Sequence, residues 1–182
     1  MFTNHALSCR RAANSNDFDL IKALGQAELA LYHQHLLRLG WQCRRSRFGN
    51  ETSDQFLRGY VDRVDLANTA VLGYFSEDGM RGAIELRSLR SVWCEAAEVA
   101  LSVEPGWRSQ GVGSALMMRT LELARGLGVE RVFLICDRMN RPMQRIAEKA
   151  CACICFERSE CLAQISLPRL QHHEGSHGRY AA

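Results

Sequence analysis

The chain has 182 residues, of which 47% are hydrophobic and 24% are charged, as expected of a globular protein with one sizeable core. A formal net charge of +3 is too small to indicate nucleic-acid binding, and no apolar run approaches the roughly 20 residues that span a bilayer. We predict one domain over residues 1–170 and a disordered polar tail over residues 171–182, with no nucleic-acid or membrane partner.

The first residues contain no apolar segment of a secretory signal. This favours a cytoplasmic protein, in which the eight cysteines are reduced. The pattern leaves the oligomeric state open, a homodimer included.

Helical periodicity dominates the start of the chain. Apolar residues recur at three- and four-residue spacing over residues 17–39, with Gly25 as a candidate break between two helices. A second short helix is predicted to begin at an N-cap, Ser53 or Asp54. The basic stretch between them holds Arg44, Arg45 and Arg47. We favour a solvated loop there, with contact to an acidic or nucleotide acceptor as the alternative.

The middle of the chain changes to the period of strands. We predict strands over residues 69–75, 82–89 and 95–103, with Asp78-Gly79 as the turn between the first two. Short connections favour an antiparallel meander.

The last part alternates helices and strands. A helical stripe runs over residues 112–127 and ends at Gly128. The apolar run over residues 131–136 predicts a strand covered on both faces, and Asn140 caps a helix that extends to residue 150. Two short strands follow, over residues 151–156 and 160–167. The predicted fold is α/β with a mixed sheet, in which an antiparallel part meets a parallel β-α-β unit.

A glycine-rich corner separates the third strand from the long helix. It reads WRSQGVGSALM, with Arg108 three residues before Gly111 and with Gly113 two residues after it. The pattern lacks the Lys-Ser or Lys-Thr of a P-loop and the third glycine of a dinucleotide fingerprint. A helix start with close-approaching glycines and one arginine suits a pyrophosphate, and a plain turn is the alternative.

The order of these motifs carries a resemblance. Residues 95–157 contain the strand AEVALSVEP, the corner above, the strand VFLIC and a helix with Asn-x-x-Met. This segment resembles the acetyl-CoA-binding core of the GNAT N-acetyltransferase superfamily. The resemblance implies a mostly antiparallel central sheet that splays at its parallel β-α-β unit and is flanked by helices.

The resemblance also implies the cofactor contacts. The backbone of residues 110–114 would surround the pyrophosphate of acetyl-CoA, residues 101–103 would pair with the pantetheine arm, and Asn140 would lie near that arm. The implied cofactor-binding residues are Leu101, Ser102, Val103, Arg108, Ser109, Gln110, Gly111, Val112, Gly113, Ser114 and Asn140.

Strand alternation selects Glu98 as the candidate general base. Glu98 shares one face of its predicted strand with two small residues, Ala100 and Ser102, as in a cleft. In GNAT members that this chain resembles, a glutamate at this place in the strand serves as the general base. An exposed or ion-paired role is the alternative. Glu85, on the neighbouring strand, could strengthen Glu98 as a base by repulsion, but we favour a cross-strand pair of Glu85 with an arginine.

The general acid is missing from the pattern. Many GNAT members carry a tyrosine on the last helix, and Ala147 stands at that position here. Cys151 and Ala152 replace the Gly-Phe pair that usually follows it. Three alternatives for protonation of the leaving group stay open: water acts as the acid, a residue elsewhere in the chain does, or the thiolate leaves without an acid.

The cysteines and histidines predict no metal site. Cys151, Cys153 and Cys155 alternate along a strand and lack the Cys-x-x-Cys spacing that zinc prefers, so we predict buried reduced thiols. His33 and His35 are two apart and face different sides of a helix.

The sequence thus predicts an enzyme that transfers acetyl from acetyl-CoA to a primary amine: a protein lysine, a peptide N-terminus or a small amine. A non-catalytic acyl-CoA sensor or interaction domain is the main rival, and a redox or metal protein is a further one.

Overall fold

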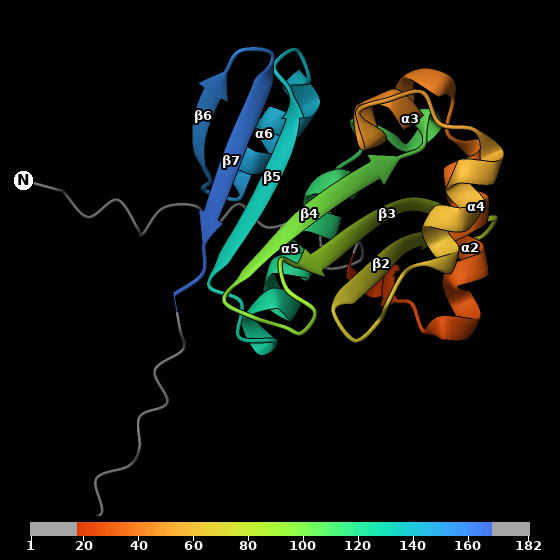
Figure 1. Cartoon of the computed structure of the whole chain (residues 1–182). Helices are drawn as coiled ribbons and strands as arrows, with labels where there is room; N and C mark the ends of the chain where they lie inside the picture. The colour runs from red at the N-terminus through yellow and green to blue at the C-terminus, as the bar shows by residue number, and fades with distance from the viewer. Residues whose placement is uncertain (1–17, 169–182) are drawn as a thin grey trace, which may run out of the picture.

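The computed structural model describes residues 18–168, which form one seven-stranded sheet in the order β1-β2-β3-β4-β5-β7-β6 (Figure 1). All neighbours pair antiparallel except β4 and β5, which are parallel. The strands are β1 (Ile21–Ala23), β2 (Thr69–Ser76), β3 (Gly79–Ser88), β4 (Ala96–Val103), β5 (Arg131–Asp137), β6 (Cys153–Glu157) and β7 (Glu160–Ser166). The helices are η1 (Gln26–Glu28), α2 (Leu29–Arg38), α3 (Trp41–Phe48), α4 (Asp54–Asp62), η2 (Pro105–Trp107), α5 (Val112–Gly126) and α6 (Arg141–Lys149).

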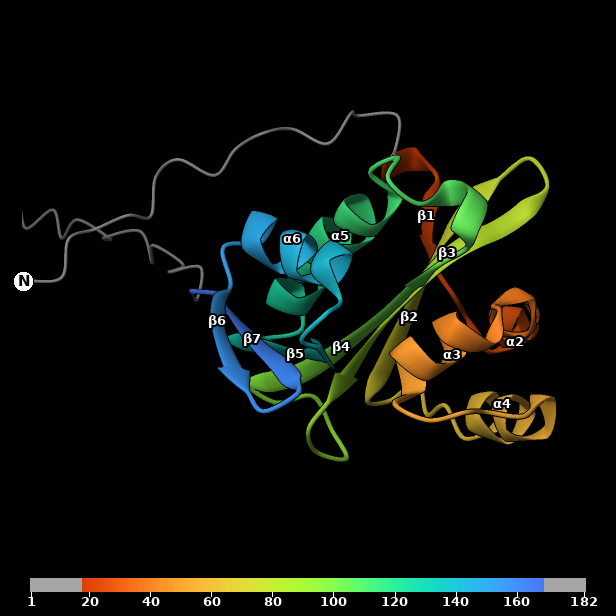
Figure 2. The ribbon, with the colours of Figure 1, turned by 90° about the horizontal axis from the view of Figure 1, so that it is seen from above.

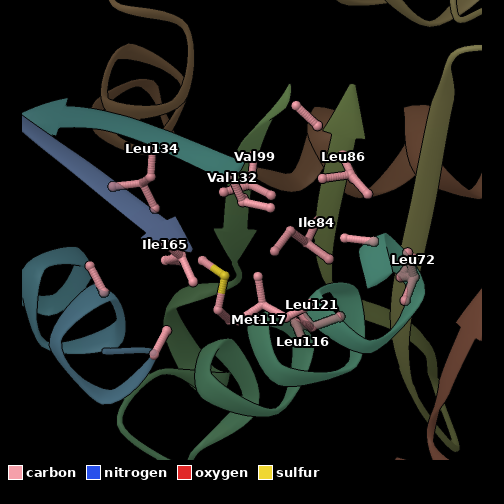
Figure 3. Close-up of a cluster of buried hydrophobic side chains, with 14 of the residues drawn as sticks. Leu72, Ile84, Leu86, Val99, Leu116, Met117, Leu121, Val132, Leu134 and Ile165 are labelled. Atoms are coloured by element: carbon pink, nitrogen blue, oxygen red, sulfur yellow. The ribbon is translucent and has the colours of Figure 1, made fainter. Parts of the chain in front are cut away.

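Helices cover the sheet on both faces. Helices α2, α3 and α4 lie on one side, and α5 and α6 lie on the other (Figure 2). Leu116 and Met117 of α5 pack against Ile84, Leu86 and Val99 of the sheet and form the larger core (Figure 3). Within residues 18–168, no helix is long and apolar enough to span a membrane.

The mixed sheet and most predicted elements are confirmed. Gly79 adopts φ 110° in the β2–β3 turn, a conformation that favours glycine. The Ser53 side chain caps α4 by accepting a hydrogen bond from the Phe56 amide, and Asn140 caps α6 in the same way. The predicted tail and the first 17 residues lie outside the described residues.

Two predictions near the N-terminus were wrong. Residues Ile21–Ala23 form strand β1, which pairs with β2, rather than the start of a helix. The basic stretch forms helix α3 rather than a loop, and Gly49 ends it at φ 77°. Tertiary packing decided both cases: Ile21 is buried in the larger core, and Arg47 is held by buried partners on other elements.

The C-terminal strands differ from the prediction in burial. Strand β5 is covered on one face only, since Ile135 is 51% exposed. Cys151, Cys153 and Cys155 are exposed, not buried. Strand β6 is the edge of the sheet, and its Ile154 packs towards the core, so alternation turns the neighbouring thiols to the face that carries no helix (Figure 2).

Candidate functional site

Strands β4 and β5 separate along their length. They pair only from Ala96 to Glu98, which lie opposite residues 131–133. Beyond Glu98, β4 continues to Val103 beside β3 while β5 turns away (Figure 1). The predicted splay is therefore present, and one edge of residues 100–103 has no described strand beside it.

A cavity of about 290 Å³ opens at this splay. Residues from β4, α3, α6 and the glycine corner line it: Gln42, Cys43, Ser46, Arg47, Leu101, Ser102, Val103, Trp107, Arg108, Ser109, Gly113, Asn140, Pro142, Met143 and Ile146. A long apolar arm with polar ends fits such a wall, because backbone groups of β4 stand beside apolar side chains of α6.

The glycine corner forms the start of α5 at one end of this cavity. Gly111 is the N-cap and adopts φ 91°, and Ser109 adopts φ 60°, which is costly for a residue other than glycine. No side chain of residues 18–168 caps the helix. The first amides of α5 therefore point out of the helix with the positive end of its dipole. Such a turn is built to hold an anion.

Gly113 allows a close approach to this corner. A Cβ at this position would lie 2.8 Å from Ile146 Cδ1 and 3.3 Å from Leu101 Cδ2, and both of those residues line the cavity. A larger side chain would therefore fill the end of the cavity where the amides stand.

Arg108 brings a positive charge to the same place. Its Nε donates to the Val103 carbonyl at 3.0 Å, and its Nη2 donates to Cys43 Sγ at 2.8 Å. These bonds hold the guanidinium against the cavity wall. Gln110 is exposed, and its side-chain amide donates to the Gly106 carbonyl at 2.8 Å.

The family model described as Acetyltransferase (GNAT) family matches residues 34–152, more than half of the chain. The chain belongs to the GNAT acetyltransferase family.

Solved GNAT structures share its fold. The GNAT domain of S. lividans PAT is 16% identical, with a TM-score of 0.69 over 81% of this chain and 89% of that one. RimL, a ribosomal L7/L12 alpha-N-protein acetyltransferase in complex with coenzyme A, is 16% identical, with a TM-score of 0.63 over 81% and 93%. The ribosomal-protein-S18-alanine N-acetyltransferase of Escherichia coli is 12% identical, with a TM-score of 0.62 over 84% and 96%. No curated protein matches the sequence.

The GNAT fold brings most of the predicted cofactor residues together. The residues that line the cavity are Leu101, Ser102, Val103, Arg108, Ser109, Gly113 and Asn140. The others, Gln110, Gly111, Val112 and Ser114, adjoin Gly113 at the start of α5 without lining the cavity, and the Val112 side chain is in the core. Asn140 also donates to Ser46 Oγ at 3.1 Å, which joins α6 to α3 across the cavity.

Glu98 stands at the point where β4 and β5 separate. Its side chain is exposed, and no ion pair of the described residues includes it. The register places it opposite Arg87 of β3. A free carboxylate at the apex of the splay is available to a ligand that enters there.

Helix α3 contributes residues to the cavity, although the sequence predicted a loop in this stretch. Cys43, Ser46 and Arg47 all line the cavity. Gly49, which follows two basic residues of the last turn, is the sequence signal that could have indicated this helix. In contrast, Ala147 is buried in α6, so the described structure offers no hydroxyl at the position of the family tyrosine.

Glu85 is held in a buried cluster between α2, α3 and α4. Tyr60 donates to its Oε2 at 2.6 Å, Tyr32 at 3.1 Å and Arg47 at 3.2 Å. Glu85 therefore pairs with an arginine, but the predicted cross-strand pair was wrong, because Arg47 belongs to helix α3. Burial opposes the charge of Arg47, but Tyr32, Tyr60 and Glu85 outweigh it and raise the pKa of the guanidinium. The guanidinium of Arg47 is therefore charged at any physiological pH.

His35 is fully buried and joins α2 to the end of β4. Its Nδ1 lies 3.2 Å from Glu104 Oε1, and its Nε2 lies 2.9 Å from Ser102 Oγ. Burial lowers the pKa of His35 to about 4, although the hydrogen bond and charge of Glu104 act in the opposite direction. The imidazole is therefore neutral at pH 7. Because a carboxylate only accepts, Nδ1 donates to Glu104 and Nε2 accepts from Ser102, which fixes this part of β4.

Acid is expected to destabilise the protein through His35. The pKa of His35 is about 4 in the folded state and about 6.5 in an unfolded chain. Between these pH values only the unfolded chain binds a proton at this residue. The contribution of His35 to the free energy of unfolding is therefore complete above pH 6.5 and is lost as the pH falls towards 4. The loss amounts to about 3 kcal/mol of unfolding free energy. Urea denaturation of wild type and His35→Gln at several pH values measures it. The variant should lose this part of the pH dependence, whereas the control His33→Gln should keep it; equal slopes for wild type and His35→Gln would contradict the assignment.

Proposed function

We propose that this GNAT protein transfers the acetyl group of acetyl-CoA to a primary amine. One observation carries the proposal: an uncapped helix start with two glycines and Arg108 stands at one end of a cavity that follows the free edge of β4. The amides suit a diphosphate, and the edge of residues 100–103 suits the amide groups of the pantetheine arm. The complex of RimL with coenzyme A is consistent with this assignment for the shared fold.

Each residue has a role in the proposed reaction. The backbone of residues 110–114 and Arg108 bind the diphosphate, and residues 101–103 orient the arm so that its thioester reaches the splay. Glu98 accepts a proton from the acceptor ammonium, directly or through water, and so frees the nitrogen lone pair for attack on the acetyl carbonyl. The C–N bond forms, the C–S bond breaks, and the coenzyme leaves as its thiol or thiolate.

Ligand-dependent thermal unfolding tests the first half of this proposal. Acetyl-CoA at a hundredfold excess over its Kd should stabilise the protein by about 2.7 kcal/mol, because it binds only the folded state. NAD, which also carries a diphosphate but lacks the pantetheine arm, is the control and should not stabilise. Stabilisation by NAD, or by neither compound, would contradict the assignment of the cavity.

The second candidate is a non-catalytic acyl-CoA sensor. The absence of a tyrosine at Ala147 favours it, whereas the free carboxylate of Glu98 favours an enzyme. Release of free thiol from acetyl-CoA in the presence of an amine distinguishes them. An enzyme releases thiol in proportion to acetylated amine, and a sensor binds acetyl-CoA without turnover.

A further inference from the structure

A second cavity, of about 460 Å³, lies at the other end of β3. Its wall is built from the end of α4, the segment that leads from α4 to β2, the last residues of β3 and the loop that follows them. Residues 101–103, which line the first cavity, pair with the first half of β3. The second cavity is lined by Glu85 and Arg87, in the second half of the same strand. The two cavities thus follow the same pair of strands from opposite ends.

The buried cluster around Glu85 separates the two cavities. Arg47 lines the first cavity, and its partners Glu85 and Tyr60 line the second. The strand register places Glu98 opposite Arg87, and Arg87 lines the second cavity. An acceptor in the second cavity would therefore reach the splay from the side opposite to the diphosphate end.

Three arginines outnumber the two carboxylates, Asp65 and Glu85, in the lining of this cavity. Arg63, Arg87 and Arg90 line it, and all three side chains are exposed. In the part of the chain that the structure describes, no ion pair engages any of their guanidinium groups. Unpaired guanidinium groups around one small cavity favour a ligand that carries a carboxylate or a phosphate.

Two carboxylates of the opposite sign line the same cavity: Asp65, which is exposed and accepts a hydrogen bond from the Ala67 amide, and Glu85, which is buried. The hydrogen bonds from Tyr32, Tyr60 and Arg47 all end on Oε2, and none from a described residue reaches Oε1. Oε1 is also absent from the fully buried atoms without a partner, so it remains accessible from the cavity. An accessible carboxylate oxygen of a largely buried residue, next to exposed guanidinium groups, suits a ligand that has both an amine and an anionic group.

We propose that the second cavity binds the acceptor, and that the acceptor is a small zwitterionic amine. The anionic group, a carboxylate or a phosphate, pairs with Arg63, Arg87 and Arg90, while Glu85 Oε1 receives a hydrogen bond from the amine and turns it towards Glu98. A volume of about 460 Å³ is in the range of small-molecule sites. The positive rim disfavours polyamines and lysine side chains, which carry no anion beside the amine. This inference rests on the proposed acetyl transfer and specifies its acceptor.

Matched pairs of amines test the acceptor class. With acetyl-CoA at saturation, thiol release is measured for free amino acids beside their C-terminal amides, and for phosphoethanolamine beside ethanolamine. The anionic member of a pair should have at least a tenfold higher kcat/KM. The amino-acid pairs and the phosphoethanolamine pair distinguish a carboxylate from a phosphate. Putrescine and an acidic peptide with a free N-terminus complete the panel.

Variants then locate the anion contact. Arg63→Gln, Arg87→Gln and Arg90→Gln together should lower, by at least tenfold, the ratio of kcat/KM for the preferred anionic amine to kcat/KM for its analogue without the anionic group. Arg125→Gln, an exposed arginine on the far side of α5, is the control and should change neither. The Kd of acetyl-CoA should be the same in all of these proteins.

The outcomes separate this inference from the proposed function. If acetyl-CoA neither binds nor is turned over, the proposed function fails. If acetyl-CoA binds and turnover is fastest with the amines that lack an anionic group, with putrescine or with the peptide N-terminus, the zwitterion assignment is overturned while acetyl transfer stands. The same holds if the arginine variant has the same ratio of kcat/KM for each pair as wild type.

Discussion

Valine in place of Gly113 is expected to raise the Kd for acetyl-CoA by at least about a hundredfold, which corresponds to about 3 kcal/mol. The valine methyl groups would occupy the space between Ile146, Leu101 and the start of α5, where a Cβ alone lies 2.8 Å from Ile146 Cδ1. The ligand would then be kept from the amides that hold its diphosphate. Isothermal titration calorimetry with acetyl-CoA measures the change.

Two further variants make this result specific. Gly126→Val alters a glycine at the other end of α5 that has nothing within 4 Å of its Cβ position, so it should leave the Kd unchanged. Gly113→Ala adds a methyl group that meets only the flexible end of Ile146 at less than 3 Å, so it should fold and show a smaller loss of affinity. Unchanged affinity in folded Gly113→Val would show that the ligand does not approach this end of the cavity.

Glutamine in place of Glu98 is expected to lower kcat by about 10²- to 10⁴-fold, the usual contribution of a positioned general base. The amide keeps the size of the side chain but cannot accept the proton. Because Glu98 is exposed and contacts no described ion-pair partner, the free energy of unfolding and the Kd for acetyl-CoA should change little. Steady-state thiol release, with the acceptor in excess, gives the rate.

Glu95→Gln is the matched control for this variant. Glu95 precedes β4, is exposed, and pairs with Arg131 at 3.6 Å, a surface ion pair of little energetic weight. Its loss should leave kcat within about twofold of wild type, whereas Glu98→Gln should show the full loss given above. Full activity of Glu98→Gln would remove Glu98 from the mechanism and direct attention to water or to another base.

Local patterns predicted much of the fold because they are local in origin. The Asp78-Gly79 turn, the Ser53 cap and the stripe of α5 each depend on residues close in sequence, and each is present. Strand β1 could not be predicted in this way. Its three residues continue a helical pattern, and only pairing with β2, about 50 residues later in the chain, makes them a strand.

The candidate site also combines a local motif, which the sequence reveals, with long-range contacts, which it does not. The glycine corner and Arg108 form one contiguous motif, which sequence alone identifies together with Glu98. The Glu85 cluster joins residues from α2, α3, α4 and β3, and the separations of 53, 38 and 25 residues along the chain leave no local signal. Arg47 shows the consequence: in the sequence it is one of several basic residues, and in the fold it is a buried ion-pair partner at the wall of the cavity.

A crystal structure of the protein with bound coenzyme A tests the central assignment most directly. We expect the diphosphate oxygens to accept hydrogen bonds from the backbone amides of residues 110–114, and the pantetheine arm to lie along the free edge of residues 101–103. Coenzyme A bound at any other place, with the amides at the start of α5 facing only solvent, would contradict it.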